Sequence, residues 1–435
     1  MENQAISEAP LSESKASSKP FYGRKLILIL GLVYFCSSGF ILPAANIINP
    51  IMLQDPSMGL NGTLLGIGFS LFILFQGISA PLVGGLVARK GVRFSMVVGA
   101  TIMVISSIVL IFFVKSPIMY VIFFGVTVSV GTMMAGQLAV QSTIGEWFIA
   151  RRGTAMTAMM IIGASAALIA PPLVDAVITA TGGQWQSGWY LYAGLSIFII
   201  PIAIFLVKNK PSDIGQFPDG AASTADLVAE QKDFKVYKNV DSVPFSKAIR
   251  TRTFWLISLA ATGGFAAYSL ASSQGVIHFT TLGFDRDLIV GGVALMGGAG
   301  LVGKILMGSV SDHIEPVRLI SISAILLAVG ILAASFATNA FMVYVFYFCI
   351  GFGFGAVSAT FPTAMANYFG AGSFSKNLGT GIFITTIVAS SLPILSGAIF
   401  DATGQCTYAF FIAAAIMVVC ALCGLLVKFP NKNKG

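Results

Sequence analysis

The stretch GGLVARKGVR, residues 84–93, is a short basic turn between two long apolar runs. The runs at 60–87 and 94–114 are each long enough to cross a lipid bilayer as a helix, which takes about 20 apolar residues. A comparable junction, GSVSDHIEPVR at 308–318, begins 224 residues later (308 − 84 = 224) and again follows an apolar run. The repeated junction indicates a membrane protein built from two copies of one helical unit.

The composition of the whole chain supports a polytopic membrane protein. Only 10% of the 435 residues are charged, 56% are hydrophobic and 35 are Phe, whereas a soluble domain carries about 25% charged residues. The net charge of +8 is therefore no reason to expect nucleic acid as a partner. Cys420 and Cys423 form C-x-x-C inside an apolar run, without the second ligand pair of a metal site. We expect neither a metal nor a cofactor.

One long polar stretch, 208–252, divides twelve apolar runs into six and six. We therefore expect an all-α membrane protein with twelve transmembrane helices in two six-helix halves. The expected spans are 26–52, 60–87, 94–114, 117–141, 153–178, 187–207, 254–280, 288–311, 317–337, 340–364, 377–400 and 407–428. The expected domains are a disordered cytosolic tail (1–24), an N-terminal half (25–207), a cytosolic linker (208–252), a C-terminal half (253–428) and a cytosolic tail (429–435).

Landmarks within the two halves repeat at nearly the same spacing. The pairs are Trp147-Phe148 with Tyr368-Phe369 (368 − 147 = 221), Pro171 with Pro393 (393 − 171 = 222), and ATGG at 180–183 with ATGQ at 402–405 (402 − 180 = 222). Two such halves related by an axis along the membrane normal form a known transporter architecture.

The positions of Lys and Arg predict the orientation. Lys115, Arg286 and Lys304 are the exceptions, and the other 22 basic residues (25 − 3 = 22) lie on the side of both termini and the linker. Because basic residues favour the cytosolic side, we expect a multi-pass protein of the cytoplasmic (inner) membrane with both termini in the cytosol.

The opening stretch resembles the G-x-L-x-D-R-x-G-R-R signature of the major facilitator superfamily. Gly85, Arg89, Gly91 and Arg93 match it, whereas Ala88 stands where the signature has Asp. The resemblance covers all twelve spans and implies a monomeric transporter in the lipid membrane that works by alternating access. Its implied partners are a small organic anion and a proton or counter-anion.

In this superfamily the charged loops help to close the cytosolic gate. The resemblance assigns that role to five residues, namely Arg89, Arg93, Arg151, Arg152 and Asp312. The Ala88 substitution weakens the expected contact in the first half.

Within the superfamily, the chain is most similar to the monocarboxylate and oxalate/formate transporters. The matching features are SG (38–39) before Asn49-Pro50, EWFIARRGTA (146–155), KPSDIGQFPDG (210–220) and GKILMGSVSD (303–312). The last of these carries a basic residue eight positions before its Asp.

Lys304 is the candidate anchor for a substrate anion. Gly298, Gly303 and Lys304 fit G-x-x-x-x-G-K, but the match lies in an apolar span and Ile305 replaces the Ser or Thr of a P-loop. A lysine there costs roughly 2.5–3.5 kcal/mol, and at eight residues from Asp312 it lies about 12 Å from the end of the helix. We expect the flanking glycines, Gly300 and Gly308, to leave open space around the ammonium. A snorkelling or glycine-packed lysine is the alternative.

The resemblance also implies a set of pocket walls. These are Leu42, Gln137, Phe354, Ser358 and Thr385. Thr385 stands where carriers of dianions are expected to have a second basic residue, so one fixed charge favours a monocarboxylate over a dicarboxylate. His278 is either a polar cap at the membrane surface or a residue of the outer gate that binds a proton.

The spans show no mid-membrane carboxylate that would carry a proton, so Lys304 is expected to load proton and carboxylate together as a neutral pair. We predict a secondary active transporter of a small monocarboxylate such as lactate, pyruvate or acetate. Exchange of organic anions of the oxalate/formate type and efflux of drug-like solutes are the alternatives. An enzyme is not expected, because no His, Asp and Glu cluster at one depth.

Overall fold

The computed structural model describes residues 20–60, 62–114, 116–221, 236–239 and 242–428. Most of the two predicted tails, at 1–19 and 429–435, therefore lies outside the described residues. The described part holds twelve helices long and apolar enough to cross a membrane, and it contains no strand. These observations confirm the predicted all-α fold.

Four of the six membrane-crossing helices of the N-terminal half consist of more than one helical segment. The first helix comprises α1 (Gly23–Tyr34), η1 (Phe35–Gly39) and α2 (Phe40–Leu53), and it is followed by the continuous helices α3 (Gly62–Lys90) and α4 (Val92–Phe112). The fourth comprises α5 (Pro117–Tyr120), η3 (Val121–Val128), α6 (Ser129–Ala135) and α7 (Gln137–Trp147). The fifth comprises α8 (Arg152–Ala164) and α9 (Ala166–Ala180), and the sixth comprises α10 (Gln186–Pro201) and η4 (Ile202–Leu206). The periodicity of the sequence did not predict these interruptions.

The six helices of the C-terminal half run without a break. They are α13 (Arg252–Thr281), α14 (Arg286–Val310), α15 (Pro316–Ser335), α16 (Ala340–Phe369), α17 (Phe374–Thr403) and α18 (Thr407–Leu425). In the described part of the chain, four short segments lie outside the spans: η2 (Pro56–Met58), η5 (Pro211–Ile214), η6 (Pro218–Gly220) and α12 (Phe245–Ala248).

Local chemistry explains where the helices begin and end. The Thr251 hydroxyl caps α13 by accepting a hydrogen bond from the Phe254 amide at 3.3 Å, and Asn339 caps α16 through the Met342 amide at 3.1 Å. Gly91 has φ 86°, a value that favours glycine, and it turns the chain from α3 into α4. The opening stretch therefore forms the expected turn between two spans.

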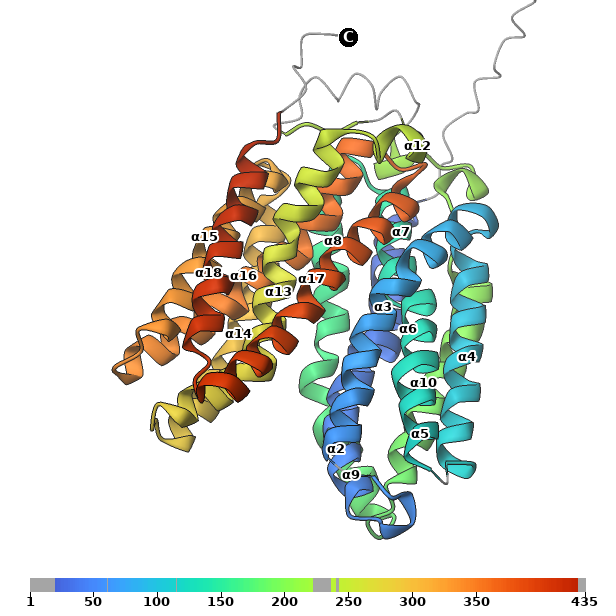
Figure 1. Ribbon diagram of the computed structural model, residues 1–435. Helices are drawn as coiled ribbons and strands as arrows, with labels where there is room; N and C mark the ends of the chain where they lie inside the picture. The colour runs from blue at the N-terminus through green and yellow to red at the C-terminus, as the bar shows by residue number, and fades with distance from the viewer. Residues whose placement is uncertain (1–19, 61, 115, 222–235, 240–241, 429–435) are drawn as a thin grey trace, which may run out of the picture.

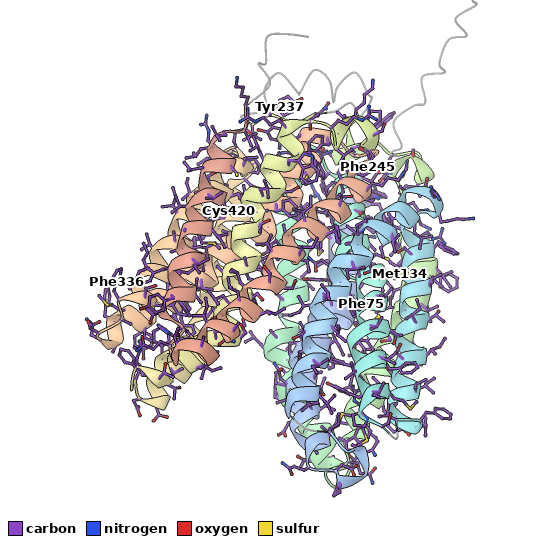
Figure 2. All side chains as sticks on the ribbon, in the orientation of Figure 1. Phe75, Met134, Tyr237, Phe245, Phe336 and Cys420 are labelled. Atoms are coloured by element: carbon purple, nitrogen blue, oxygen red, sulfur yellow. The ribbon has the colours of Figure 1, made fainter. Side chains whose placement is uncertain are left out.

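The two halves lie side by side (Figure 1). We call the end that carries α12 and the described chain ends the linker end, and the opposite end the far end. The ribbons of the two halves meet at the linker end and diverge toward the far end. Tyr237 and Phe245 lie at the linker end, whereas Phe336 lies at the far end of the C-terminal half (Figure 2). Large apolar side chains such as Leu82, Phe341 and Ile394 are exposed, as expected for a surface that faces lipid.

The helix pairs α3 with α17 and α8 with α14 make the largest contacts between the halves. In the first pair, glycines allow the backbones to approach closely. A Cβ on Gly84 would clash with the Ser375 carbonyl, and a Cβ on Gly379 would clash with the Ala80 carbonyl. The pair is therefore packed through bare backbone near the linker end.

Gly84→Ala is expected to force α3 away from α17, because the added methyl group has no free space. Overpacking of this kind costs about 1–3 kcal/mol. We expect a wider separation of spin labels on Lys90, at the end of α3, and Arg250, two residues before α13, both exposed, in a chain whose native cysteines are replaced. Gly85→Ala is the matched control, since a Cβ there meets nothing within 4 Å. An equal widening by both variants would contradict the packing argument.

Candidate substrate site and linker-end contacts

Lys304 lies deep in α14, toward the linker end. It follows Arg286 by 18 residues (304 − 286) and precedes Val310 by six, which places it about 27 Å from the far end of the helix and about 9 Å from the linker end. The side chain is partly exposed. Among the described residues no carboxylate pairs with its ammonium, and the ammonium lies 5.9 Å from the ring centroid of Phe354. This distance is within the range of a cation–π contact.

Phe354 belongs to a small aromatic group on α13 and α16. Its ring stacks on Tyr268 with centroids 4.1 Å apart and an interplanar angle of 21°, and it meets Phe265 edge-on at 5.6 Å. Phe354 was predicted as a pocket wall, but Tyr268 was not. One signal that could have found Tyr268 is its polar hydroxyl in an otherwise apolar and small-residue stretch of α13.

The prediction that two glycines leave open space around Lys304 is wrong for Gly308. A Cβ on Gly308 would clash with the Thr157 hydroxyl of α8, in the other half. The same Thr157 hydroxyl donates a hydrogen bond to the Lys304 carbonyl at 3.4 Å. A Cβ on Gly300 would reach the Gly351 carbonyl at 3.4 Å. The glycines therefore allow α8 and α16 to approach α14.

The other predicted positions of the C-terminal half are buried. The Ser358 hydroxyl donates to the Gly355 carbonyl at 2.8 Å, and the Thr385 hydroxyl, with the residue 0% exposed, donates to the Ile382 carbonyl at 2.8 Å. His278 is 1% exposed, bonds the Ala334 carbonyl at 2.9 Å and stacks on Phe410. It lies only three residues before the end of α13. The structure therefore places His278 near the far end of α13, away from Lys304. His278 is also more buried than a polar cap at the membrane surface would be.

In the N-terminal half, the fourth helix breaks about as far from its own far end as Lys304 lies from the far end of α14. Gly136 follows Pro117 by 19 residues (136 − 117), so it lies about 28 Å from the far end of that helix. The Ser38 hydroxyl fills the break: it donates to the Thr132 carbonyl at 3.1 Å and accepts from the Gln137 amide at 3.3 Å.

Of the two wall residues predicted in this half, Gln137 begins α7 directly after the break and is partly exposed. Leu42 is partly exposed as well, and it packs against the apolar core of its half. In the sequence, Ser38 belongs to the SG match with the monocarboxylate and oxalate/formate transporters. Its role at the break was not predicted.

At the linker end, Asp312 joins the two halves. Its carboxylate accepts hydrogen bonds from the Gly153 amide at 3.0 Å, and from the amide and hydroxyl of Thr154 at 2.8 and 2.7 Å. These amides belong to the first turn of α8, where the helix dipole favours a negative charge. A carboxylate from the C-terminal half thus caps a helix of the N-terminal half.

Arg152 makes the reciprocal contact. It is 0% exposed, and its guanidinium donates to the Phe148 carbonyl and, across the halves, to the Ala366 carbonyl, each at 2.7 Å. Ala366 lies in the last turn of α16, where the dipole favours a positive charge.

The remaining predicted gate residues do not cross the halves in the described part of the chain. Arg89 and Arg151 are exposed, and Arg93 bonds Ile204 and Asn209 within its own half.

The linker takes part in the same contacts. The Lys238 ammonium lies 3.4 Å from Asp312 Oδ1, with the two side chains 2% and 7% exposed, and it also donates to the Ala150 carbonyl of the N-terminal half. Burial lowers the pKa of Lys238, and the neighbouring Asp312 carboxylate partly opposes that shift. The Asn239 amide donates to the Asn367 carbonyl at 2.7 Å. A linker that was expected to be a simple connection is therefore anchored between the halves.

The second contact region, between α3 and α17, has a different chemistry. Phe374 corresponds to Arg152 by the repeat spacing (374 − 152 = 222), and its ring occupies the place where a Cβ on Gly145 would lie. Ala88 corresponds to Asp312 (312 − 88 = 224) and is exposed. The positions that correspond to the charged Arg152 and Asp312 thus carry apolar side chains in the other half.

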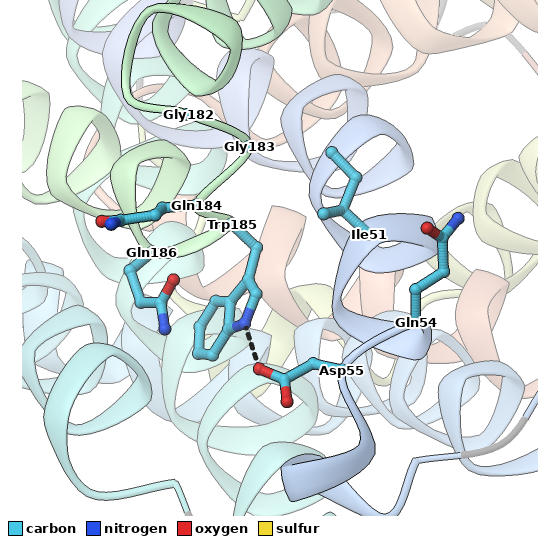
Figure 3. Close-up of a pocket in the computed structure, with 8 residues that line it drawn as sticks. All are labelled: Ile51, Gln54, Asp55, Gly182, Gly183, Gln184, Trp185 and Gln186. Atoms are coloured by element: carbon cyan, nitrogen blue, oxygen red, sulfur yellow. Dashed lines mark hydrogen bonds between the residues drawn. The ribbon is translucent and has the colours of Figure 1, made fainter.

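A separate hollow of about 540 Å³ lies at the far end of the N-terminal half (Figure 3). It is lined by Ile51, Gln54, Asp55, Gly182, Gly183, Gln184, Trp185 and Gln186. The Trp185 indole donates to Asp55 at 2.9 Å across it. The hollow lies where α2 ends and α10 begins, so it is no part of the surroundings of Lys304.

Three curated relatives resemble the chain at low identity. The uncharacterised MFS-type transporter YhjX of Escherichia coli (strain K12) is 23% identical over 252 residues, 56% of this chain and 57% of that protein. The uncharacterised MFS-type transporter YcxA of Bacillus subtilis (strain 168) is 23% identical over 390 residues, 86% of this chain and 87% of that protein. Monocarboxylate transporter 7 of Homo sapiens is 33% identical over 178 residues, 40% of this chain and 33% of that protein. The match thus spans little more than half of YhjX.

The fold is that of solved transporters. The chain aligns with the Escherichia coli fucose:proton symporter FucP at a TM-score of 0.64 and 14% identity, covering 94% of this chain and 100% of that one. A second structure of FucP, in the outward conformation, aligns at a TM-score of 0.66 and 13% identity with the same coverage. The family model described as Major Facilitator Superfamily matches residues 26–391 and 294–434. The chain therefore belongs to the major facilitator superfamily of transporters.

Proposed function

We propose that the protein is a secondary active transporter that moves a small monocarboxylate together with a proton across the cytoplasmic membrane. The observation that carries the proposal is Lys304, a partly exposed lysine deep in α14 with no carboxylate partner among the described residues. A charge at that depth is costly, so its retention is explained by an anion that binds there during transport.

A single charge favours a substrate with one carboxylate. Thr385, the position expected to be basic in carriers of dianions, is a fully buried threonine whose hydroxyl bonds its own helix. The wall beside the ammonium is aromatic, which suits a small apolar body. The partial likeness to a monocarboxylate transporter supports the same class.

In this proposal the linker end faces the cytosol, because Lys and Arg gather on that side. The contacts of Asp312 and Arg152 then act as the cytosolic gate. They support an outward-facing arrangement, in which a substrate reaches Lys304 from the far end and leaves once these contacts separate.

The test is uptake of labelled lactate, pyruvate, acetate, glycolate, formate and oxalate into proteoliposomes, with and without an inward proton gradient. We expect at least one monoacid to enter faster than oxalate and the gradient to accelerate its entry. If uptake required an anion inside the vesicles and did not respond to the proton gradient, the transporter would work by anion exchange and not by proton coupling. A preference for oxalate over every monoacid would contradict the proposal.

A further inference from the structure

Tyr268 lies on the approach from the far end to Lys304. It precedes the end of α13 by 13 residues (281 − 268), so it lies about 20 Å from the far end, whereas Lys304 lies about 27 Å from it. Phe354, 14 residues into α16 (354 − 340), lies about 21 Å from the far end. The two rings therefore share one level, roughly one helical turn nearer the far end than the ammonium.

The tyrosine ring is exposed although its helix is mostly buried. Tyr268 is 36% exposed, while its neighbours Ala267, Leu270 and Ala271 are at most 2% exposed. Its close stack on Phe354 holds the ring in place, and Phe265 braces Phe354 from another side. Aromatic pairs have preferred geometries, so Tyr268 forms a fixed edge beside Phe354, the ring that the Lys304 ammonium also faces.

The space around Lys304 is limited toward the linker end. There the Thr157 hydroxyl and the Gly308 backbone of opposite halves are in direct contact. A carboxylate bound to the ammonium must therefore extend its body toward the far end, past the rings of Phe354 and Tyr268.

We propose that Tyr268 is a specificity-determining residue that restricts the site beside Lys304 to monocarboxylates with a short carbon chain. The inference rests on the proposed function, because it assumes that the acid binds to Lys304. The hydroxyl of Tyr268 is not required for this role, since the ring provides the steric limit and stacks on Phe354.

Binding of acetate, butyrate and hexanoate to the purified protein, measured by calorimetry, tests the proposal without interference from membrane permeation by the acids. We expect the wild type to bind acetate more tightly than hexanoate, and Tyr268→Ala to raise the hexanoate-to-acetate affinity ratio at least about tenfold, in the range that apolar pockets show for added methylenes. Tyr268→Phe keeps the stack and is expected to keep the wild-type ratio.

Leu259→Ala is the matched control. Leu259 is exposed on the same helix and lies nine residues away, on the opposite face. An unchanged ratio in Tyr268→Ala, or an equal change in Leu259→Ala, overturns the inference. Lys304→Gln tests the proposed function separately from the inference. If this variant loses acid binding while Tyr268→Ala keeps the wild-type hexanoate-to-acetate ratio, only the role of Tyr268 is removed. A wild type that binds none of the acids overturns both.

Discussion

Replacing Lys304 by Gln is expected to lower monocarboxylate uptake about 100-fold, the largest effect that we predict for a single side chain. The carboxylate would lose its charged donor, and a hydrogen bond to a charged group contributes about 1.5–3 kcal/mol, with each 1.4 kcal/mol worth about tenfold in affinity. Initial rates of labelled acid uptake at low concentration would measure the loss.

The Gln variant should still fold. Removing a lysine from the membrane interior relieves roughly 2.5–3.5 kcal/mol of insertion cost, and no carboxylate among the described residues is left without a partner by the change. Size-exclusion chromatography and thermal unfolding should match the wild type. Lys304→Arg retains the charge and should keep part of the uptake. Normal proton-coupled uptake by a well-folded Lys304→Gln would remove the anion anchor and with it the proposed mechanism.

Asp312→Asn is expected to open the linker end. The amide can no longer accept every hydrogen bond from Gly153 and Thr154, and the ion pair between Asp312 and Lys238 is lost. One charged hydrogen bond contributes about 1.5–3 kcal/mol, so the ratio of closed to open linker ends should fall roughly 10- to 100-fold. Spin labels on Lys90 and Arg250 should show a new population at longer distance.

Asp175→Asn is the control for this change, because Asp175 is exposed on α9. It should leave the distance distribution as in the wild type. An unchanged distribution in Asp312→Asn would mean that the α3–α17 packing alone holds the linker end closed, and Asp312 would not be a gate residue.

The sequence predicted the features that depend on composition. Twelve helices follow from twelve apolar runs, and Lys304 is conspicuous because it is a lone cation inside one of them. Asp312 could be singled out because it stands in a repeated junction with a recognisable signature, and in the structure its carboxylate caps α8.

Features that depend on partners could not be predicted. Gly308 identifies a helix face on which a neighbour can approach, but nothing in its surroundings says that Thr157 of the other half does so. Lys238 is one basic residue in a polar linker, and only the folded chain buries it against Asp312. Tyr268 is one of many aromatic residues in an apolar chain, and its contact with Phe354 depends on the packing of α13 against α16.

Under the proposed function, the break at Gly136 affects how the transported acid loses its water. Interrupting a helix frees backbone amides and carbonyls, which must find partners inside a membrane, and Ser38 and Gln137 gather there with the hydroxyl of Thr132 and the amide of Gln76. One half of the protein is therefore rich in neutral hydrogen-bonding groups beside this break, and the other half offers one ammonium beside an aromatic surface. Under the proposed function, an acid that moves between the halves exchanges its hydration shell for both, so the repeated sequence yields one half that substitutes for water and one that neutralises charge.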